Sequence, residues 1–348
     1  MTSSASPSIP TPPPEDPPPS SFDIVSHYHH LLATDPLLTQ SIAAIESLIS
    51  LLSASPPSTI SETLSLLASS TATLKASTSN PIPLSAGTDL FQRYIISTLQ
   101  PGGSTSSTGG GAEDFQAVRE HLLANSRLFV QRAREARGRI AAVARNFIRD
   151  GSTVLTCGSL RVVATVLNAA ADRGTTFRVI YIEDSQRFKD SRSRATDVIR
   201  DLRQRGVPVA TIPFAALATA LSSATFAMVG AESVVANGGV ISSTGTYQIG
   251  LLMQSVGKPF YVVAESHTFV RMYPLTYKDL PNGQGGLDFR TDDVTEDGEG
   301  KAEHEEGRRK ADDDGVDLTP PELITAFVTE AGVQSPSAIS EELIKIWY

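Results

Sequence analysis

Residues 229–250 read VGAESVVANGGVISSTGTYQIG, and this stretch indicates how the second half of the chain folds. An apolar, β-branched run ends at Gly230, a glycine-rich turn follows, and a helical pattern begins at Thr246. The runs STVLTC, FRVIYI, VPVATI, FAMVG and FYVVA are similarly short and alternate with amphipathic stretches. Short apolar strands that alternate with helices are typical of a mostly parallel sheet covered by helices. We therefore predict an α/β fold for this part of the chain.

The first half of the chain has a helical pattern instead. Apolar side chains recur at steps of three and four in residues 38–52. Thr59 and Glu62 have the spacing of a capping box, and Asp89 and Asp114 are predicted N-caps of two further helices. The strongest helical stripe follows Asp114.

These patterns predict two domains. An N-terminal helical domain occupies residues 22–149, and a Rossmann-like, mostly parallel α/β domain occupies residues 150–348. Composition indicates three disordered or flexible segments: a Ser/Pro-rich tail at residues 1–21, a Gly/Ser-rich linker at 100–113 and an acidic insertion at about 282–317.

The bulk composition excludes several classes of function. The net charge of -9 argues against unspecific nucleic-acid binding. No apolar run approaches the roughly 20 residues that cross a bilayer, and the N-terminus lacks the basic-then-apolar order of a signal peptide. Cys157 is the one cysteine, which excludes an internal disulfide and a cysteine-built zinc site. We expect a soluble, cytoplasmic protein that binds no metal, no membrane and no nucleic acid directly.

Ligands of open α/β sheets bind beyond the carboxyl ends of the strands, so the loops there are candidate sites. In the first such loop, Thr156, Cys157, Gly158 and Ser159 lie between a strand and a helix. Backbone N–H groups at a helix start, together with two hydroxyls, favour a phosphate or another anion. Cys157 is either a reactive thiol with a depressed pKa or a small buried side chain that fills space.

The glycine-rich loop is a second candidate anion site. Residues 237–239 can take positive φ, and Thr244–Thr246 stand at a helix start. Glu232 is the one carboxylate of this loop and the natural candidate for proton transfer. No GxGxxG motif follows a strand, which argues against a dinucleotide site. The predicted ligand-binding residues are Thr156, Gly158, Ser159, Arg161, Asn237, Gly238, Thr244, Gly245 and Thr246.

Four long blocks carry a resemblance to a known family: VGAESVVANGGVISSTGTYQIG, KPFYVVAESHTFVRMYPL, TPPELIT and SAISEELIKIWY. Through them the chain resembles the regulatory subunits of eukaryotic translation initiation factor 2B, the alpha subunits most closely, and the related sugar-phosphate isomerases. The resemblance spans about residues 22–348 apart from the acidic insertion. It implies an N-terminal helical domain, a Rossmann-like C-terminal domain and a homodimer formed through the latter.

The isomerase relatives act on methylthioribose 1-phosphate or ribose 1,5-bisphosphate, with a cysteine and an aspartate as the proton-handling pair. Cys157 matches the cysteine, but Glu232 stands where the aspartate is expected, and Ser242 and Ser243 replace an asparagine and a lysine. Misplacing a catalytic group by about 1 Å can cost ~10²-fold in rate. We therefore expect a noncatalytic, vestigial site that requires no cofactor and retains a pocket for a sugar phosphate or nucleotide monophosphate. The alternative is an active aldose–ketose isomerase that acts on a ribose 1-phosphate derivative.

The family's role implies a regulatory subunit of the guanine-nucleotide exchange factor for initiation factor 2. Its homodimer would bridge two half-complexes, with the beta, gamma, delta and epsilon subunits, into a decamer. Its helical domain would help to sense the phosphorylated alpha subunit of initiation factor 2. An arginine-rich helix suits a phosphoprotein, and a solvated face that pairs with acidic neighbours explains it equally well. The predicted partner-binding residues are Arg132, Arg134, Arg137 and Arg139.

The block KPFYVVAESHTFVRMYPL is more apolar and aromatic than a loop leaving a sheet normally is. We predict the dimer interface there, at Phe269, Arg271 and Tyr273. Alternatively, part of the block belongs to the core and the interface lies elsewhere.

Overall fold

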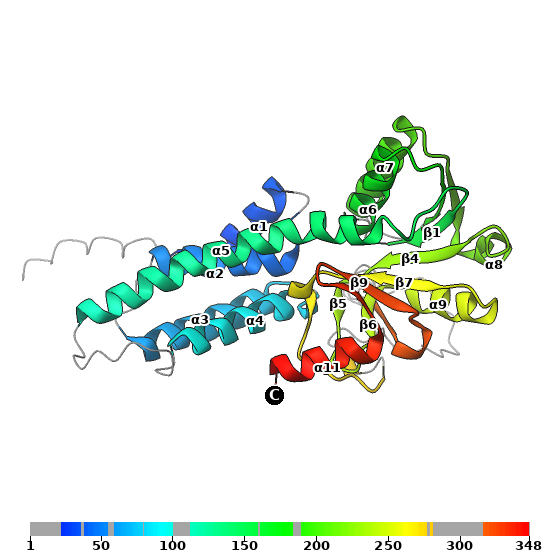
Figure 1. Cartoon of the computed structure of the whole chain (residues 1–348). Helices are drawn as coiled ribbons and strands as arrows, with labels where there is room; N and C mark the ends of the chain where they lie inside the picture. Colours follow the sequence, from blue (N-terminus) through cyan, green and yellow to red (C-terminus); the bar gives the residue numbers. More distant parts are fainter. Residues whose placement is uncertain are drawn as a thin grey trace, which may run out of the picture.

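The computed structural model has a helical half and an α/β half (Figure 1). It describes residues 22–35, 38–54, 59–78, 80–99, 112–158, 161–183, 189–276, 279–280 and 316–347. The predicted tail lies outside the described residues, as do positions 100–111 of the predicted linker and 282–315 of the predicted insertion.

Five helices build the first half: α1 (Ile24–Thr34), α2 (Gln40–Ala54), α3 (Ile60–Ala76), α4 (Ile82–Leu99) and α5 (Ala112–Ala144). Thr59 Oγ1 accepts a hydrogen bond from Glu62 N at 3.1 Å, so the predicted cap of α3 is confirmed. The predicted cap at Asp89 is wrong, because this residue lies inside α4.

The true starts of α4 and α5 differ from the predicted ones. Asn80 Oδ1 accepts a hydrogen bond from Ile82 N at 3.2 Å, so an asparagine before a proline marks the start of α4. Helix α5 begins at Ala112, before the predicted cap Asp114, and the end of the predicted linker is therefore helical.

Helix α2 is the centre of the helical half. It packs against α1, α4 and α5, and its side chains Ile45 and Leu48 are fully buried. The close approach of α4 depends on Gly87, because a Cβ there would lie 2.5 Å from the carbonyl oxygen of Ser41 on α2. Phe91, one turn further along α4, is also fully buried in this core.

The main sheet of the second half has seven strands in the order β10–β9–β7–β4–β1–β2–β3. Their bounds are β1 (Thr153–Cys157), β2 (Arg178–Glu183), β3 (Val209–Pro213), β4 (Phe226–Gly230), β7 (Phe260–Val263), β9 (Ala326–Thr329) and β10 (Gly332–Gln334). Neighbouring strands are parallel except β10, which runs antiparallel to β9. The predicted Rossmann-like α/β class is confirmed.

A second, three-stranded antiparallel sheet was not predicted. It has the order β5–β6–β8, formed by β5 (Ser233–Val234), β6 (Val240–Ser243) and β8 (Val316–Thr319). The first two strands come from the stretch that was interpreted as a loop. The third includes Val316 and Asp317, which were assigned to the acidic insertion, so that insertion was predicted to extend too far.

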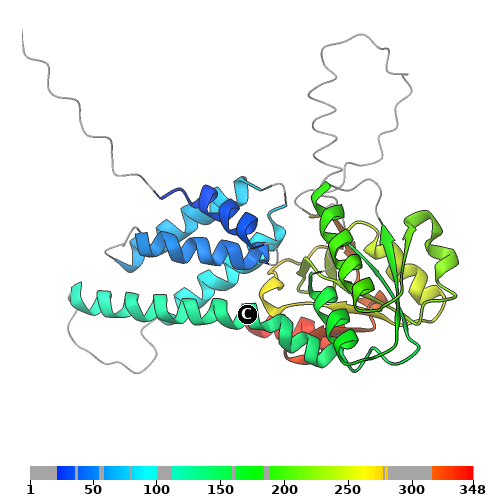
Figure 2. The ribbon, with the colours of Figure 1, turned by 90° about the horizontal axis from the view of Figure 1, so that it is seen from above.

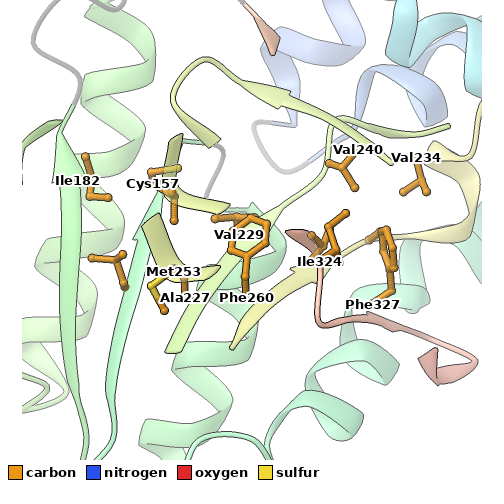
Figure 3. Packing of buried hydrophobic residues seen from close by; sticks show 14 of the residues in the cluster. Cys157, Ile182, Ala227, Val229, Val234, Val240, Met253, Phe260, Ile324 and Phe327 are labelled. Atoms are coloured by element: carbon orange, nitrogen blue, oxygen red, sulfur yellow. The ribbon is translucent and has the colours of Figure 1, made fainter. Parts of the chain in front are cut away.

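Helices cover both faces of the main sheet. The remaining ones are α6 (Arg161–Asp172), α7 (Lys189–Gln204), α8 (Leu217–Ala220), α9 (Thr246–Ser255) and α11 (Pro336–Trp347), with the 3-10 helices η1 (Phe214–Ala216), η2 (Ser266–Thr268) and η4 (Pro321–Leu323). One core contains side chains of α5, α6 and α7; the other contains side chains of α8, α9 and α11 and the small sheet (Figure 3). None of the described helices is both long and apolar enough to span a bilayer.

Helix α5 belongs to both halves (Figure 2). Val130 and Ala133, in its middle, are buried in the helical core. Ile140 and Ala144, at its end, are buried against the main sheet. A single continuous helix therefore joins the two hydrophobic cores.

Two glycines on helices of the first half provide a matched test of the α2–α4 contact. Gly87→Ala is expected to lower the free energy of unfolding by about 1–3 kcal/mol, because its Cβ has no room. Gly138 on α5 is exposed, with nothing within 4 Å of a Cβ placed there. Gly138→Ala should therefore raise the free energy of unfolding by roughly 0.5–1 kcal/mol through helix propensity. Urea unfolding followed by circular dichroism measures both, and stabilisation by both substitutions contradicts the close approach at Gly87.

Candidate functional site

The strand order reverses beside β1, which lies between β2 and β4. In open α/β sheets such a switch point leaves a crevice beyond the carboxyl ends of the two strands, where ligands bind. Cys157 ends β1 and Gly230 ends β4. The topology therefore puts the first and third predicted loops at the point where chemistry is expected.

Cys157 is buried at the end of β1, with 3% of its surface exposed. It lies in one packed layer with Ile182 and Val229 (Figure 3). Its Sγ is 3.9 Å from Thr246 Oγ1, and this hydroxyl donates to the carbonyl oxygen of Ser243 at 2.7 Å. The thiol therefore contacts the start of α9 from inside the core.

Glu232 joins the strand-end loop to the helical half. Its Oε2 accepts a hydrogen bond from Asn80 Nδ2 at 3.1 Å, and its Oε1 accepts one from Ser243 Oγ at 3.4 Å. Ser243 also reaches the first loop, because a Cβ at Gly158 would lie 2.8 Å from its Oγ. Gly158 has a φ of 65°, so glycine is needed there for conformation and for space. The structure thus brings Cys157, Gly158 and Glu232 together around Ser243.

An internal carboxylate occupies the predicted anion site at the start of α9. Asp317 Oδ2 accepts hydrogen bonds from Gly245 N at 2.7 Å and Tyr247 N at 3.0 Å. Gly245 has a φ of 98°, and the ring of Phe214 packs where its Cβ would be. Asp317 reaches the helix because β8 pairs with β6. The backbone N–H groups of Gly245 and Tyr247 therefore hold a side chain of the protein at the place where an external anion was predicted.

Asn237 and Gly238 lie at the turn of the β5–β6 hairpin. Asn237 Oδ1 accepts a hydrogen bond from Gly239 N at 2.8 Å, and its Nδ2 donates to Pro274 O at 3.4 Å. A Cβ at Gly238 would lie 2.5 Å from the carbonyl oxygen of Pro336, at the start of α11. Gly238 therefore packs against the start of α11, and Asn237 contacts the segment that follows η2.

Arg161 links the start of α6 to the helical half, and Thr156 lies in β1 next to Cys157. Arg161 Nη1 donates to Leu38 O at 2.9 Å, so the start of α6 is tied to the segment before α2. Burial raises the pKa of Tyr28 on α1, and the charge of Arg161 opposes this shift. Tyr28 Oη and Thr156 Oγ1 are buried and have no hydrogen-bond partner among the described residues. Ser159 lies outside the described residues.

The four predicted partner-binding arginines do not form one surface. Arg134 forms ion pairs with Glu46 at 2.6 Å and Asp35 at 3.3 Å. Arg137 is mostly buried and was wrongly predicted to face a partner. Arg132 and Arg139 are exposed, with Arg139 Nη2 donating to the carbonyl oxygen of Arg132 at 3.1 Å. Arg134 and Arg137 thus pair with acidic residues, whereas Arg132 and Arg139 contact each other and are exposed.

Arg137 instead takes part in a buried polar cluster that sequence analysis missed. Its Nε donates to Glu265 Oε1 at 2.9 Å, and Glu265 is 2% exposed. His267 is 3% exposed, with its Nε2 3.1 Å from Thr39 Oγ1 on the other side of the junction. Burial lowers the pKa of His267, against the opposing charges of Glu265 and Glu330. The sequence does contain a signal for this cluster, because Glu265 and His267 follow the carboxyl end of the apolar run FYVV.

The predicted dimer-interface residues differ in exposure. Phe269 is 3% exposed and forms a parallel bridge with Val234, so its prediction as an interface residue is wrong. Arg271 is exposed, and Tyr273 is 65% exposed. After Val270, exposed side chains at Arg271 and Tyr273 alternate with the less exposed Met272 and Pro274.

Two arginines one turn apart on α5 test the energetic role of the buried cluster. Arg137→Met is expected to lower the free energy of unfolding by about 3 kcal/mol or more, because it leaves the buried Glu265 carboxylate without its charged partner. Arg134→Met removes a pair whose arginine side chain is 45% exposed, so a loss below about 1 kcal/mol is expected. Urea unfolding at neutral pH measures both. Equal losses would contradict the importance assigned to the Arg137–Glu265 pair.

Residues 34–336 match the Initiation factor 2 subunit family. Translation initiation factor eIF2B subunit alpha of Dictyostelium discoideum is 30% identical over 333 residues, covering 93% of this chain and 96% of that protein. Methylthioribose-1-phosphate isomerase of Desulforudis audaxviator is 30% identical over 236 residues, 63% of each chain. The crystal structure of eIF2B beta from Chaetomium thermophilum has a TM-score of 0.69 at 15% identity, covers 93% of this chain and 92% of its own, and shows the common fold. The chain therefore belongs to the Initiation factor 2 subunit family.

Proposed function

We propose that this protein is a noncatalytic regulatory subunit of the guanine-nucleotide exchange factor for translation initiation factor 2, acting in the cytoplasm. Its family, and its similarity to an eIF2B alpha subunit over nearly the whole of both chains, support this role. The observation that carries the noncatalytic part is the position of Glu232. Its carboxylate oxygens accept hydrogen bonds from Asn80 and Ser243 and so hold α4 against the strand-end loop. A carboxylate engaged in this way is poorly available as a general base.

In this proposal the chain forms a homodimer that bridges two half-complexes, each with beta, gamma, delta and epsilon subunits, into a decamer. The side chains that support an interface are Tyr273, 65% exposed, and Leu275, 79% exposed. Exposed aromatic and aliphatic side chains that are adjacent on one surface are typical of interfaces. Arg132 and Arg139 remain as the exposed arginines that suit the phosphorylated alpha subunit of initiation factor 2.

The deciding experiment isolates the complex through a tag on one of the other exchange-factor subunits and measures its mass. With this chain present we expect a decamer, and without it smaller complexes. Tyr273→Asp should separate the halves, because it puts a charge into the proposed dimer contact. Tyr247→Asp is the matched control, since Tyr247 on α9 is 39% exposed and lies outside that segment. A chain that never joins the complex would rule out the proposal.

The same complex tests the sensing surface. Arg132→Glu combined with Arg139→Glu should leave assembly intact and weaken the preference for the phosphorylated partner by about tenfold, a loss of about 1.4 kcal/mol. Arg145→Glu with Arg149→Glu reverses two other exposed arginines and serves as the control. An unchanged preference in the first variant would exclude this surface.

We further propose that the junction beside Thr156 keeps a site for a sugar phosphate or a nucleotide monophosphate. The support is two buried hydroxyls, of Tyr28 on α1 and Thr156 in β1, that have no hydrogen-bond partner among the described residues, together with the charge of Arg161 that acts on Tyr28. Buried polar atoms without partners are costly, and a polyhydroxylated anion would satisfy them.

Calorimetry with ribose 1-phosphate, ribose 5-phosphate and adenosine monophosphate tests this site. We expect saturable binding that Thr156→Val weakens about tenfold, because one hydrogen bond is lost. Thr319→Val is the control, since its hydroxyl is also buried without a partner among the described residues but belongs to β8. Absence of heat at millimolar ligand contradicts the site.

The alternative function is an active aldose–ketose isomerase, which the isomerase relative and the retained Cys157 support. Conversion of the ribose phosphate to a ketose by the wild type, lost in Cys157→Ser, would favour this alternative.

A further inference from the structure

The 3-10 helix η2 lies between the helical half and the main sheet. It follows β7 and packs against α2 and α4. Its central residue, His267, reaches α2 through Thr39 Oγ1, 3.1 Å from Nε2. On the sheet side, Ser266 N donates to both carboxylate oxygens of Glu330 at 3.2 Å. We refer to η2 with Thr39, Arg137, Glu265 and Glu330 as the η2 latch.

The η2 latch accommodates His267 in its neutral form. Nε2 has two oxygens nearby, Thr39 Oγ1 at 3.1 Å and Glu265 Oε2 at 3.6 Å. Nδ1 is buried and has no hydrogen-bond partner among the described residues. A protonated imidazole carries an N–H on both nitrogens. Protonation in place would therefore bury a charged donor at Nδ1 with no acceptor, which is far more costly than leaving a neutral nitrogen there.

Three charged groups act on the ring from the described elements around it. Glu265 precedes η2, Glu330 follows β9, and Arg137 comes from α5; the first two favour the charged ring and the third opposes it. The carboxylate of Glu265 is already held by Arg137 at 2.9 Å, so a charged His267 would compete with Arg137 for it. In the closed latch the Glu265 carboxylate is therefore already paired with Arg137. Within the part of the chain that the structure describes, no acceptor bonds to the Nδ1 proton that a charged His267 would carry.

We propose that the η2 latch is an acid-sensitive contact, and that protonation of His267 below neutral pH releases η2 from α2 and α4. In the open latch Nδ1 reaches water, and the ring then titrates near its ordinary value of about 6.5. In the closed latch, burial keeps the pKa of His267 below that value. The closed contact is therefore fully stable above about pH 6.5 and weakens as the pH falls toward the lower value of the closed state.

Hydrogen exchange of the intact protein at pH 7.5, 6.5 and 5.5 tests the proposal, with rates corrected for the intrinsic effect of pH. We expect the opening equilibrium at residues 266–270 and 38–42 to rise by up to about tenfold per pH unit below 6.5. His267→Gln cannot take up the proton and should show no rise. His29→Gln removes an exposed histidine and should behave as the wild type does. An equal rise in His267→Gln, or no rise in the wild type, overturns the proposal.

A second measurement does not depend on the folding of the glutamine variant. Nuclear magnetic resonance of the ring protons in the wild type follows each histidine through the same pH range. His267 should remain neutral while the latch amides are protected, and it should charge only as they lose protection. Titration of His267 at about 6.5 with the latch amides still protected would overturn the proposal.

Discussion

The structure depends on one constraint: helix α5 is packed into two cores at once. Its middle buries Val130 and Ala133 among α1, α2 and α4, and its end buries Ile140 and Ala144 against the main sheet. A continuous helix has few ways to bend without a proline or a bulge. The angle between the two halves is therefore set by packing along α5. Hydrogen bonds at the junction, such as those from Arg161 to Leu38 and from Asn80 to Glu232, then fix how the two halves align.

Several polar groups of the strand-end region form hydrogen bonds with other parts of the chain. Asp317 accepts a hydrogen bond from the backbone at the start of α9, and Glu232 accepts hydrogen bonds from Asn80 and Ser243. These carboxylates stand where a substrate and a proton-transfer group are expected in an enzyme of this fold. Their intramolecular partners give the loops fixed positions. Around Tyr28 and Thr156 the situation differs, because buried hydroxyls lack partners among the described residues.

Much of the α/β architecture could be predicted from sequence, because strands that are buried on both faces have continuous apolar runs; FAMVG coincides with β4. The small sheet could not be predicted in the same way. Its strands are short, and β8 follows an acidic stretch. The roles of Asp317 and Glu232 depend on strand pairing and helix contacts between residues far apart in sequence. Local sequence patterns do not predict such contacts. Arg137 shows the same limit: helical periodicity identifies its helix, but only tertiary packing shows that it faces Glu265.

The small sheet has a consequence for how this chain can vary. Leu280 and Val316, which flank positions 281–315, are buried in one apolar cluster. When the two ends of a loop are anchored together, each doubling of its length costs only about 0.6 kcal/mol of closure entropy. Changes in the number of residues between Leu280 and Val316 are therefore expected to cost little closure entropy. Because this segment has an excess of acidic residues, the net charge of the protein can drift independently of its fold.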